Sequence, residues 1–292
     1  MSDDREQHNQ VFSAHAGHQP SVDSRIPTIT PGGQVKADFG FEVPLETVPL
    51  PSAGRVYPTT SSLYGREMVE IKAMTAREED ILTSSALLKK GTVITELIRS
   101  CLTDKSINPI DMLSGDRHAL MIAIRITGYG AEYDGEVECN ECQNKSPRQF
   151  NLGELPIKRL SIAPVAEGLN LFEFVLPYTK MNVRFKFLTG RDEEEIQATN
   201  VKQKKLQLQS DSLITTNLLY SIVSINGVED RAKIAGFVRM MPARDSLALR
   251  NYIHDNEPGI SMYQDVTCPS CGHSEEVSMP IGTSFLWPSS KR

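Results

Sequence analysis

The sequence lacks the features that mark a membrane protein, a secreted protein or a protein that binds nucleic acid through its charge. No apolar run approaches the roughly 18 to 20 residues of a membrane span. The first ten residues, MSDDREQHNQ, have neither the basic start nor the apolar core of a signal peptide. The formal net charge of -6 leaves no basic excess to attract phosphate or anionic lipid. We therefore expect a cytosolic protein in a reducing compartment, with no membrane partner and with nucleic acid as a poor default partner.

The sequence also lacks the short motifs of the common enzyme classes. It has no GxxxxGK[ST] phosphate loop, no GxSxG or HExxH motif and no glycine string of a dinucleotide-binding fold. Asp116, Arg117 and His118 are adjacent titratable residues. An aspartate at a helix start is explained first as a cap or a partner of the helix dipole, and His118 as a structural histidine. We predict that the protein is not an enzyme and has no catalytic residue, no cofactor-binding residue and no small-molecule substrate; a hydrolase is the weakest alternative.

Four of the five cysteines form two CxxC pairs, which are the most informative feature of the chain. Cys139 and Cys142 lie in CNEC, and Cys268 and Cys271 lie in CPSC, each pair between two strand-like runs. A tetrahedral zinc ion needs two such pairs to complete its ligands. We predict one structural Zn²⁺ per chain, bound by all four thiolates. Cys101, within ITELIRSCL, is interpreted as a buried apolar thiol.

Two other interpretations of the cysteine pairs stay open: reduced cysteines without metal, and redox use or disulfides. A redox CxxC of the thioredoxin type lies at the start of a helix, whereas strands flank these turns on both sides. His273 follows the second pair, but four thiolates already complete a zinc site. His8, His15 and His18 lie in a polar segment that offers no other ligands, so we interpret them as solvated side chains.

A strand followed by a helix start occurs twice in the sequence. Residues 68–74 alternate between apolar and polar side chains and lead into Thr75-Ala-Arg-Glu78, a capping box that predicts a helix. Residues 182–188 alternate in the same way and lead into Thr189-Gly-Arg-Asp192. The second occurrence follows the first by 114 residues, which indicates an internal repeat.

The helices downstream and the cysteines keep the same order in both copies. Apolar-periodic helices are predicted from Thr92 and from Ser212, and third helices from Asp116 and from Asp245. Each of these aspartates precedes the first cysteine of a CxxC pair by 23 residues. The second copy is longer by 15 residues between the cap and the cysteine, which we assign to two polar stretches, VKQKKLQLQSD and SINGVEDR.

We predict an α+β fold built from an internally duplicated unit of a strand, about three helices and a β-hairpin with a zinc knuckle. The two knuckles join in a zinc-ribbon-like four-cysteine site, with the halves related by a pseudo-twofold axis. Residues 1–40 form a flexible or extended N-terminal arm, since they carry few large apolar side chains. Residues 41–160 form the first repeat, and residues 161–292 the second. The proline-rich residues 41–58 are predicted to pack as an extended strap over a surface and not to form a central strand.

A zinc-ribbon nucleic-acid-binding module is the alternative function, because zinc ribbons often bind nucleic acid. Lys145 and Arg148 do not reverse the sign of the charge near the knuckles. The acidic residues there would repel phosphate: Glu136, Glu138, Glu141, Asp265, Glu275 and Glu276.

Residues 43–160 carry four short motifs in a fixed order: PSxGxxY, TxxEED, GDR and YGxxY. In this order they resemble the baseplate hub proteins of T4-like contractile-tailed bacteriophages. The second half departs from the pattern, with Ala-Arg-Asp245 in place of Gly-Asp-Arg117 and no YGxxY motif. The resemblance implies a non-enzymatic structural or assembly component of the hub region, with other phage baseplate and tail proteins as partners. It further implies a location in the virion tail baseplate and, during assembly, in the host cytoplasm. Whether the protein stays in the particle or acts only as an assembly factor is left open.

Overall fold

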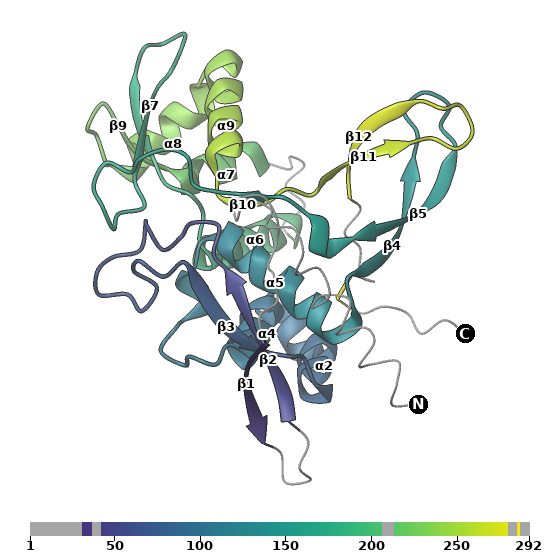
Figure 1. Cartoon of the computed structure of the whole chain (residues 1–292). Coiled ribbons are helices and arrows are strands. Elements are labelled where there is room, and N and C mark those ends of the chain that lie inside the picture. The colour runs from purple at the N-terminus through teal and green to yellow at the C-terminus, as the bar shows by residue number, and fades with distance from the viewer. Residues whose placement is uncertain (1–30, 37–41, 206–212, 280–284, 287–292) are drawn as a thin grey trace.

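The fold is a helical body with small antiparallel sheets and a pair of projecting hairpins (Figure 1). The computed structural model of the chain describes residues 31–36, 42–205, 213–279 and 285–286. The α+β class predicted from the sequence is confirmed. In the described residues no helix is long and apolar enough to span a membrane. The elements in chain order are β1 (Pro31–Lys36), β2 (Glu42–Pro49), β3 (Met68–Lys72), α2 (Ala76–Thr83), α3 (Ser85–Lys90), α4 (Val93–Cys101), η1 (Pro109–Asp111), α5 (Ser114–Tyr129), β4 (Glu132–Glu138), β5 (Lys145–Asn151), η2 (Leu152–Glu154), β6 (Ile157–Lys158), β7 (Phe172–Val175), β8 (Asn182–Phe185), α6 (Gly190–Lys205), α7 (Leu213–Ser221), β9 (Ile222–Ile225), α8 (Arg231–Met240), α9 (Ala243–Asn256), β10 (Gly259–Ile260), β11 (Tyr263–Thr267) and β12 (Ser274–Ser278).

The proline-rich segment forms a central strand, so the prediction of a surface strap was wrong. Strand β2 lies between β1 and β3 and pairs antiparallel with both. Pro44 lacks an N–H group, but it lies at a register shift in the pairing of β1 with β2, where a ladder bond is already interrupted. Its carbonyl still accepts a hydrogen bond from the Ala73 N–H at 2.9 Å. Of the predicted N-terminal arm, only residues 31–36 are among the described residues, and they form β1.

The helices of the first half begin where the sequence predicts. Thr75 caps α2 through a capping box with Glu78, and α4 begins directly after Thr92. Ser84 interrupts the first helical stretch, because its side chain accepts a hydrogen bond from the Leu87 N–H and starts α3. Helix α5 begins two residues before Asp116 and carries the most deeply buried face of this half.

The second half contains one helix that the sequence analysis missed. Helix α6 is continuous where α2 and α3 are separate, and α7 and α9 lie where helices are predicted. Helix α8 adds a fourth helix, and β9 precedes it as the third strand of the sheet β7-β8-β9. This extra material lies at SINGVEDR, one of the two stretches predicted to hold the additional length. The other stretch lies largely outside the described residues, at 206–212.

The contacts around the first helix start occur in both halves. In the first half, the Glu78 carboxylate accepts hydrogen bonds from the Thr75 N–H at 3.0 Å and from the Lys72 ammonium at 2.8 Å. In the second half, Asp192 accepts them in the same way, from the Thr189 N–H at 2.9 Å and from Lys186 at 2.7 Å. Each carboxylate therefore ties the preceding strand to the first turn of the helix.

In each half, an aspartate of the third predicted helix holds a loop between two paired strands. This loop joins β2 to β3 in the first half and β7 to β8 in the second. Asp116 of α5 accepts hydrogen bonds from the Ser52 N–H at 2.9 Å and from the Tyr57 hydroxyl at 2.6 Å. Asp245 of α9 accepts them from the Tyr178 N–H at 2.7 Å and the Thr179 N–H at 3.0 Å. Ser52 and Tyr178 each follow a Leu-Pro pair that leaves the first strand of the hairpin. Asp116 and Asp245 are fully buried, so each is a central support of its half.

Two apolar cores stabilise the molecule. The larger core runs through both halves, from Leu50 and Ile71 in the first to Phe185 and Leu249 in the second. The smaller core lies where α5 meets the base of the hairpins, and includes Tyr133 and buried side chains on either side of it in the chain. The hairpins β4-β5 and β11-β12 project together from this base (Figure 1). The cysteine turns therefore lie at the outer ends of the projecting hairpins, whose bases pack in the smaller core.

Backbone hydrogen bonds join the two halves where β6 pairs with β10 and, between the helical bodies, at a junction of residues 112–114 with residues 188–190. The Ser114 N–H donates to the Leu188 carbonyl at 2.9 Å, and the Gly190 N–H donates to the Met112 carbonyl at 3.0 Å. In the predicted repeat, residues 188–190 correspond to residues 74–76, and residues 112–114 correspond to residues 241–243. Among the described residues, no such hydrogen bond joins residues 74–76 to residues 241–243. A twofold axis would make both contacts equivalent. The predicted pseudo-twofold relation therefore does not extend to the helical bodies.

Candidate metal centre

Each CxxC pair occupies a tight turn between two strands, as predicted. The Cys139 N–H donates to the Asn144 carbonyl at 3.1 Å, and the Cys268 N–H donates to the His273 carbonyl at 2.7 Å. These bonds close the two turns at equivalent positions. The strands beneath the two turns pair in the same register. Glu138 lies opposite Lys145 in the first hairpin, and Thr267 lies opposite Ser274 in the second.

Both turns use a residue in the left-handed backbone region after the second cysteine. Gln143 has a φ of 56°, and Gly272 has a φ of 73°. Glycine adopts this conformation without cost, whereas glutamine bears strain of about 1 kcal/mol or more. The bend is therefore a requirement of the turn, because the first hairpin forms it even without glycine.

The four sulfur atoms come together at the distances that a tetrahedral metal site requires. The Sγ atoms of Cys139 and Cys271 are 3.7 Å apart, and those of Cys142 and Cys268 are 3.6 Å apart. All four lie within 4.8 Å of one another. Zinc–sulfur bonds of about 2.3 Å in a tetrahedron place sulfurs about 3.8 Å apart. A disulfide needs about 2.05 Å, so the arrangement fits a shared metal ion better than a covalent bond.

The two close pairs each join one hairpin to the other, in a reciprocal way. Cys139 begins the first turn and lies against Cys271, which ends the second; Cys142 ends the first and lies against Cys268, which begins the second. The twofold relation that fails between the helical bodies therefore holds locally at the cysteines. Each hairpin offers two ligands, and neither could complete the site alone.

The environment of the thiols favours the deprotonated form at one ligand. The backbone N–H groups of Cys271 and Ser270 lower the pKa of Cys268 to about 6. Metals bind the thiolate, so N–H groups directed at sulfur assist binding. Cys139 and Cys268 are buried, while Cys142 and Cys271 are exposed. The site therefore lies at the surface of the hairpin tips, with its inner side covered.

Polar contacts close to the cysteines hold the hairpins together. The Glu275 carboxylate accepts hydrogen bonds from the backbone and side chain of Asn140, the former at 3.0 Å. Arg148 donates to the Thr267 carbonyl from the opposite hairpin. These contacts hold the two turns against each other.

The remaining candidate ligands stay apart from the cluster. Among the described residues, the only group of three or more potential metal ligands consists of the four paired cysteines. Cys101 is buried in α4, and burial raises its pKa to about 12, as expected for an apolar thiol. His273 contributes its backbone carbonyl to the second turn. His8, His15 and His18 lie outside the described residues.

The adjacent Asp116, Arg117 and His118 take structural positions. Asp116 binds the hairpin loop, as described above, and does not cap its own helix. The Arg117 guanidinium donates to the Pro109 carbonyl at 2.9 Å and lies 3.4 Å from a Glu193 carboxylate oxygen. His118 lies 3.7 Å from the other oxygen of Glu193. Asp116 and Arg117 therefore hold α5 against its surroundings, whereas the His118 side chain is 55% exposed.

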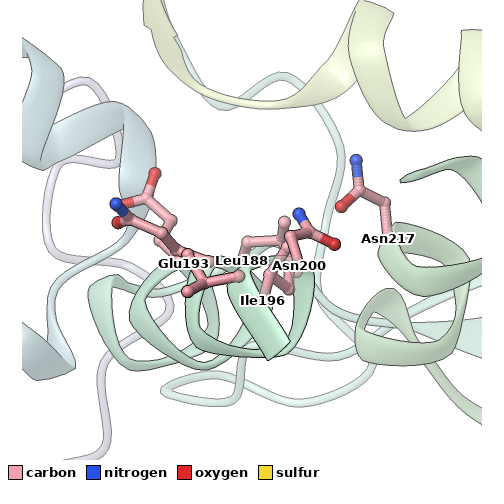
Figure 2. Close-up of a pocket in the computed structure, with 7 residues that line it drawn as sticks. Leu188, Glu193, Ile196, Asn200 and Asn217 are labelled. Atoms are coloured by element: carbon pink, nitrogen blue, oxygen red, sulfur yellow. The ribbon is translucent and has the colours of Figure 1, made fainter. Parts of the chain in front are cut away.

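A pocket of about 430 Å³ lies between α6 and α7, away from the cysteines. In Figure 2, Asn217 of α7 stands apart from the lining residues of α6. No sequence motif indicated this pocket, because its walls come from two separate helices, α6 and α7. Its only titratable lining residue, Glu193, is already paired with Arg117 and His118. The lining residues are Leu188, Glu193, Ile196, Gln197, Asn200, Val201 and Asn217.

Comparison with known proteins gives one match that covers most of the chain. A family model described as T4 bacteriophage base plate protein matches residues 50–287. This range contains both hairpins and all four paired cysteines. No curated protein and no solved structure matches the chain.

Proposed function

The chain belongs to the T4 bacteriophage base plate protein family, and from this membership we propose that it acts in the hub region of a contractile tail baseplate. Its role there is structural or assists assembly, and its partners are other baseplate and tail proteins. The protein is located in the virion tail baseplate and, during assembly, in the host cytoplasm. The family match is the observation that carries this proposal.

The four-cysteine cluster supports a structural Zn²⁺ ion bound by Cys139, Cys142, Cys268 and Cys271. The sulfur distances, the chemistry of four thiol ligands and the complete set of four protein donors all favour a closed structural site over a catalytic one. A catalytic zinc keeps a position open for water or substrate. When bound, the ion would join two hairpins that are separated by more than a hundred residues in the sequence.

The two halves, residues 41–160 and 161–292, are proposed to derive from one duplicated unit. Three sets of contacts support this proposal: the carboxylates at the first helix starts, the aspartates that hold the hairpin loops, and the paired cysteine turns. Chance agreement would need similar contacts in the same order along the chain in three separate places. The halves are therefore best regarded as two copies that have diverged at their loops.

The role is proposed to be non-enzymatic. Asp116, Arg117 and Glu193 of the helical body are engaged in hydrogen bonds or ion pairs within the fold, and the four cysteines at the hairpin tips form a complete ligand set. Glu136, Glu138 and Glu276 line a shallow groove between the hairpins. Their charge disfavours the alternative, a zinc-ribbon module that binds nucleic acid.

Mass spectrometry of purified phage particles tests the location. We expect the chain in the particle at a fixed ratio to other baseplate proteins. Its presence only in infected-cell lysates would leave an assembly factor, and its absence from both baseplates and assembly intermediates would contradict the proposal. A DNA-binding assay over a range of salt separates the alternative, which requires affinity that falls steeply as salt rises.

A further inference from the structure

The junction of residues 112–114 with residues 188–190 joins two different surfaces of the proposed repeat unit. Each half contributes only one of these two surfaces to the junction, so its other surface stays unused. Residues 112–114 of the first half pair antiparallel with residues 188–190 of the second. Gly190 permits this approach, since a Cβ atom there would lie 2.1 Å from the Arg117 guanidinium. A contact between unlike surfaces of equivalent units can repeat, and it then forms a ring or an open chain.

The unused surfaces are the outer edges of the molecule, defined as residues 74–76 and residues 241–243. They correspond in sequence to the two sides of the inner junction. Ala76 and Ala243 are exposed at the first positions of α2 and α9. Among the described residues, no hydrogen bond is made by either of their backbone N–H groups. The corresponding N–H groups of the inner junction, at Gly190 and Ser114, are both bonded across it.

Large apolar side chains are exposed beside the edge at residues 241–243. Met240 is 80% exposed and Leu247 is 50% exposed. At the inner junction the corresponding positions hold Asp111 and His118, which face Arg191 and Glu193 across the contact. Exposed apolar side chains grouped at an unpaired backbone edge are typical of a surface that another protein covers.

We propose that residues 240–247 of one copy of this chain bind residues 74–79 of a second copy, head to tail, as the inner junction binds within one chain. This inference rests on the proposed equivalence of the two halves. The Ala243 N–H would donate to the Met74 carbonyl, and the Ala76 N–H to the Met241 carbonyl. Two backbone hydrogen bonds would then repeat those between Ser114, Leu188, Gly190 and Met112.

The side chains of the second copy suit an apolar contact at this position. Met240 would lie against Arg77, which corresponds to Arg191 and is exposed. The aliphatic part of an arginine packs well on a methionine while its charge stays in water. Leu247 would lie near Glu79, whose carboxylate is drawn away by a 2.7 Å hydrogen bond from the Tyr129 hydroxyl. The ion pairs of the inner junction are thus replaced by apolar packing, which makes the outer contact distinct from the inner one.

Sedimentation of the zinc-loaded full chain over a range of concentrations tests the proposal. We expect association that continues beyond a dimer, or a closed ring, and a loss of affinity of at least tenfold in Met240→Lys, which would place a like charge against Arg77. Val165→Lys is the matched control, since Val165 is also an exposed apolar residue but lies at neither outer edge. A chain that stays monomeric at all concentrations, or equal effects of both variants, would overturn the proposal.

Cross-linking identifies which surfaces meet. Chains with Ala76→Cys are mixed with chains with Ala243→Cys and treated with a short bis-maleimide, with the unmodified chain as the control for its own cysteines. We expect the mixed pair to cross-link and each variant alone to stay uncoupled. Cross-linking of Ala243→Cys to itself would indicate a symmetric dimer and refute head-to-tail binding. Zinc content and melting temperature are measured on the same samples, so that failure of this contact is distinguishable from failure of the proposed zinc site.

Discussion

The first and second halves of the chain use buried carboxylates at the same places but differ in the groups that donate hydrogen bonds to them. In the first half, Asp116 holds a long hairpin loop through both backbone and hydroxyl donors. In the second half, Asp245 holds a short loop through two backbone N–H groups. The first half also has Gly115, which lets α5 approach the backbone at Pro258. The corresponding residue of the second half is Arg244, which is exposed.

This difference separates the contacts that both halves share from those that only one half makes. The carboxylate at the helix start, the aspartate of the third helix and the cysteine turn occur in both halves. The ion pairs of Asp111, Arg117 and His118 occur only in the first half, where they face the second. They therefore serve the junction between the halves. The predictions below test this division, from the largest expected effect to the smallest.

Loss of one cysteine from either half is expected to have the same large effect. Cys139→Ser and Cys268→Ser should each abolish zinc binding and lower the melting temperature alike, because each hairpin provides half of one ligand set. A structural zinc site contributes on the order of 10 kcal/mol in small domains, so a loss of several kcal/mol is expected here. Elemental analysis and thermal unfolding give the two readouts.

Cys101→Ala is the matched control for these variants. It removes a buried thiol outside the cluster, so stability should fall by about 1 kcal/mol while one zinc per chain is retained. A chelator should lower the melting temperature of the unmodified chain and leave the two ligand variants unchanged. If either ligand variant kept both its zinc and its melting temperature, the four-thiolate site would be refuted.

A methyl group at Gly115 is expected to have the next largest effect. A Cβ atom there would lie 1.7 Å from the Pro258 carbonyl oxygen, which belongs to backbone and cannot turn aside. Gly115→Ala should therefore destabilise the protein by about 2 kcal/mol or more, although alanine is the better helix former. The measurement is the free energy of unfolding in denaturant.

Gly236→Ala provides the control, since a Cβ atom in that part of α8 meets no atom within 4 Å. It should stabilise the protein by about 0.5 to 1 kcal/mol through helix propensity and the unfolded chain. Equal effects of the two alanines would show that Gly115 is not required by the approach of the second half.

The carboxylate at the first helix start should matter more in the first half than in the second. Burial alone would raise the pKa of Glu78, but hydrogen bonds from Lys72, Ser100 and Thr75 outweigh it and lower the pKa to about 2. Its stabilising contribution is therefore present above pH 4.5 and is lost as the pH falls toward 2. Glu78→Gln should cost about 2 kcal/mol at pH 7, and the difference from the unmodified chain should shrink as the pH falls.

Asp192→Asn is the matched change in the second half. Its carboxylate accepts from the same kinds of donors, but the Asp192 side chain is 9% exposed whereas the Glu78 side chain is 0% exposed. A smaller cost, about 1 kcal/mol, is expected. Thermal unfolding of both variants across the pH range checks the order, and a larger cost in Asp192→Asn would reverse it.

Local signals in the sequence predicted the features that depend on near neighbours. The capping box at Thr75 identified the start of α2, and the CxxC spacing identified the four cysteines that the structure brings together. Both depend on residues three positions apart, so the chain geometry carries the information. The α+β class followed from the same local patterns.

Features that depend on distant segments could not be predicted in the same way. The central position of β2 depends on pairing with β1 and β3, and the pocket depends on α6 meeting α7. Helix α8 did have a local signal: Asp230 caps it, and apolar residues follow at helical spacing, at Ile234, Phe237 and Val238. The junction of residues 112–114 with residues 188–190 also required the structure, because it joins segments that lie far apart in the sequence.

The smallest expected effect is an opposite response of Asp116 and Asp245 to pH. Burial raises the pKa of Asp116 above its usual value. At Asp245 burial acts in the same direction, but the N–H groups of Tyr178 and Thr179 outweigh it and lower the pKa. For Asp116, the contribution to stability is present below its unfolded pKa of about 3.9 and is lost as the pH rises through its folded pKa. For Asp245, the contribution is present above that value and is lost as the pH falls.

The two asparagine variants should therefore differ from the unmodified chain with opposite slopes. The cost of Asp116→Asn should decrease as the pH rises from 4 toward 7, and the cost of Asp245→Asn should increase as the pH rises through about 4, since only the latter loses a favoured charge. Carboxyl carbon NMR, assigned with these variants, measures the two titrations directly. Parallel slopes would mean that the hydroxyl donors of Ser52 and Tyr57 compensate the burial of Asp116 as fully as backbone N–H groups do for Asp245. The two halves would then be equivalent at this support, and the difference between them would lie only in the residues that face their junction.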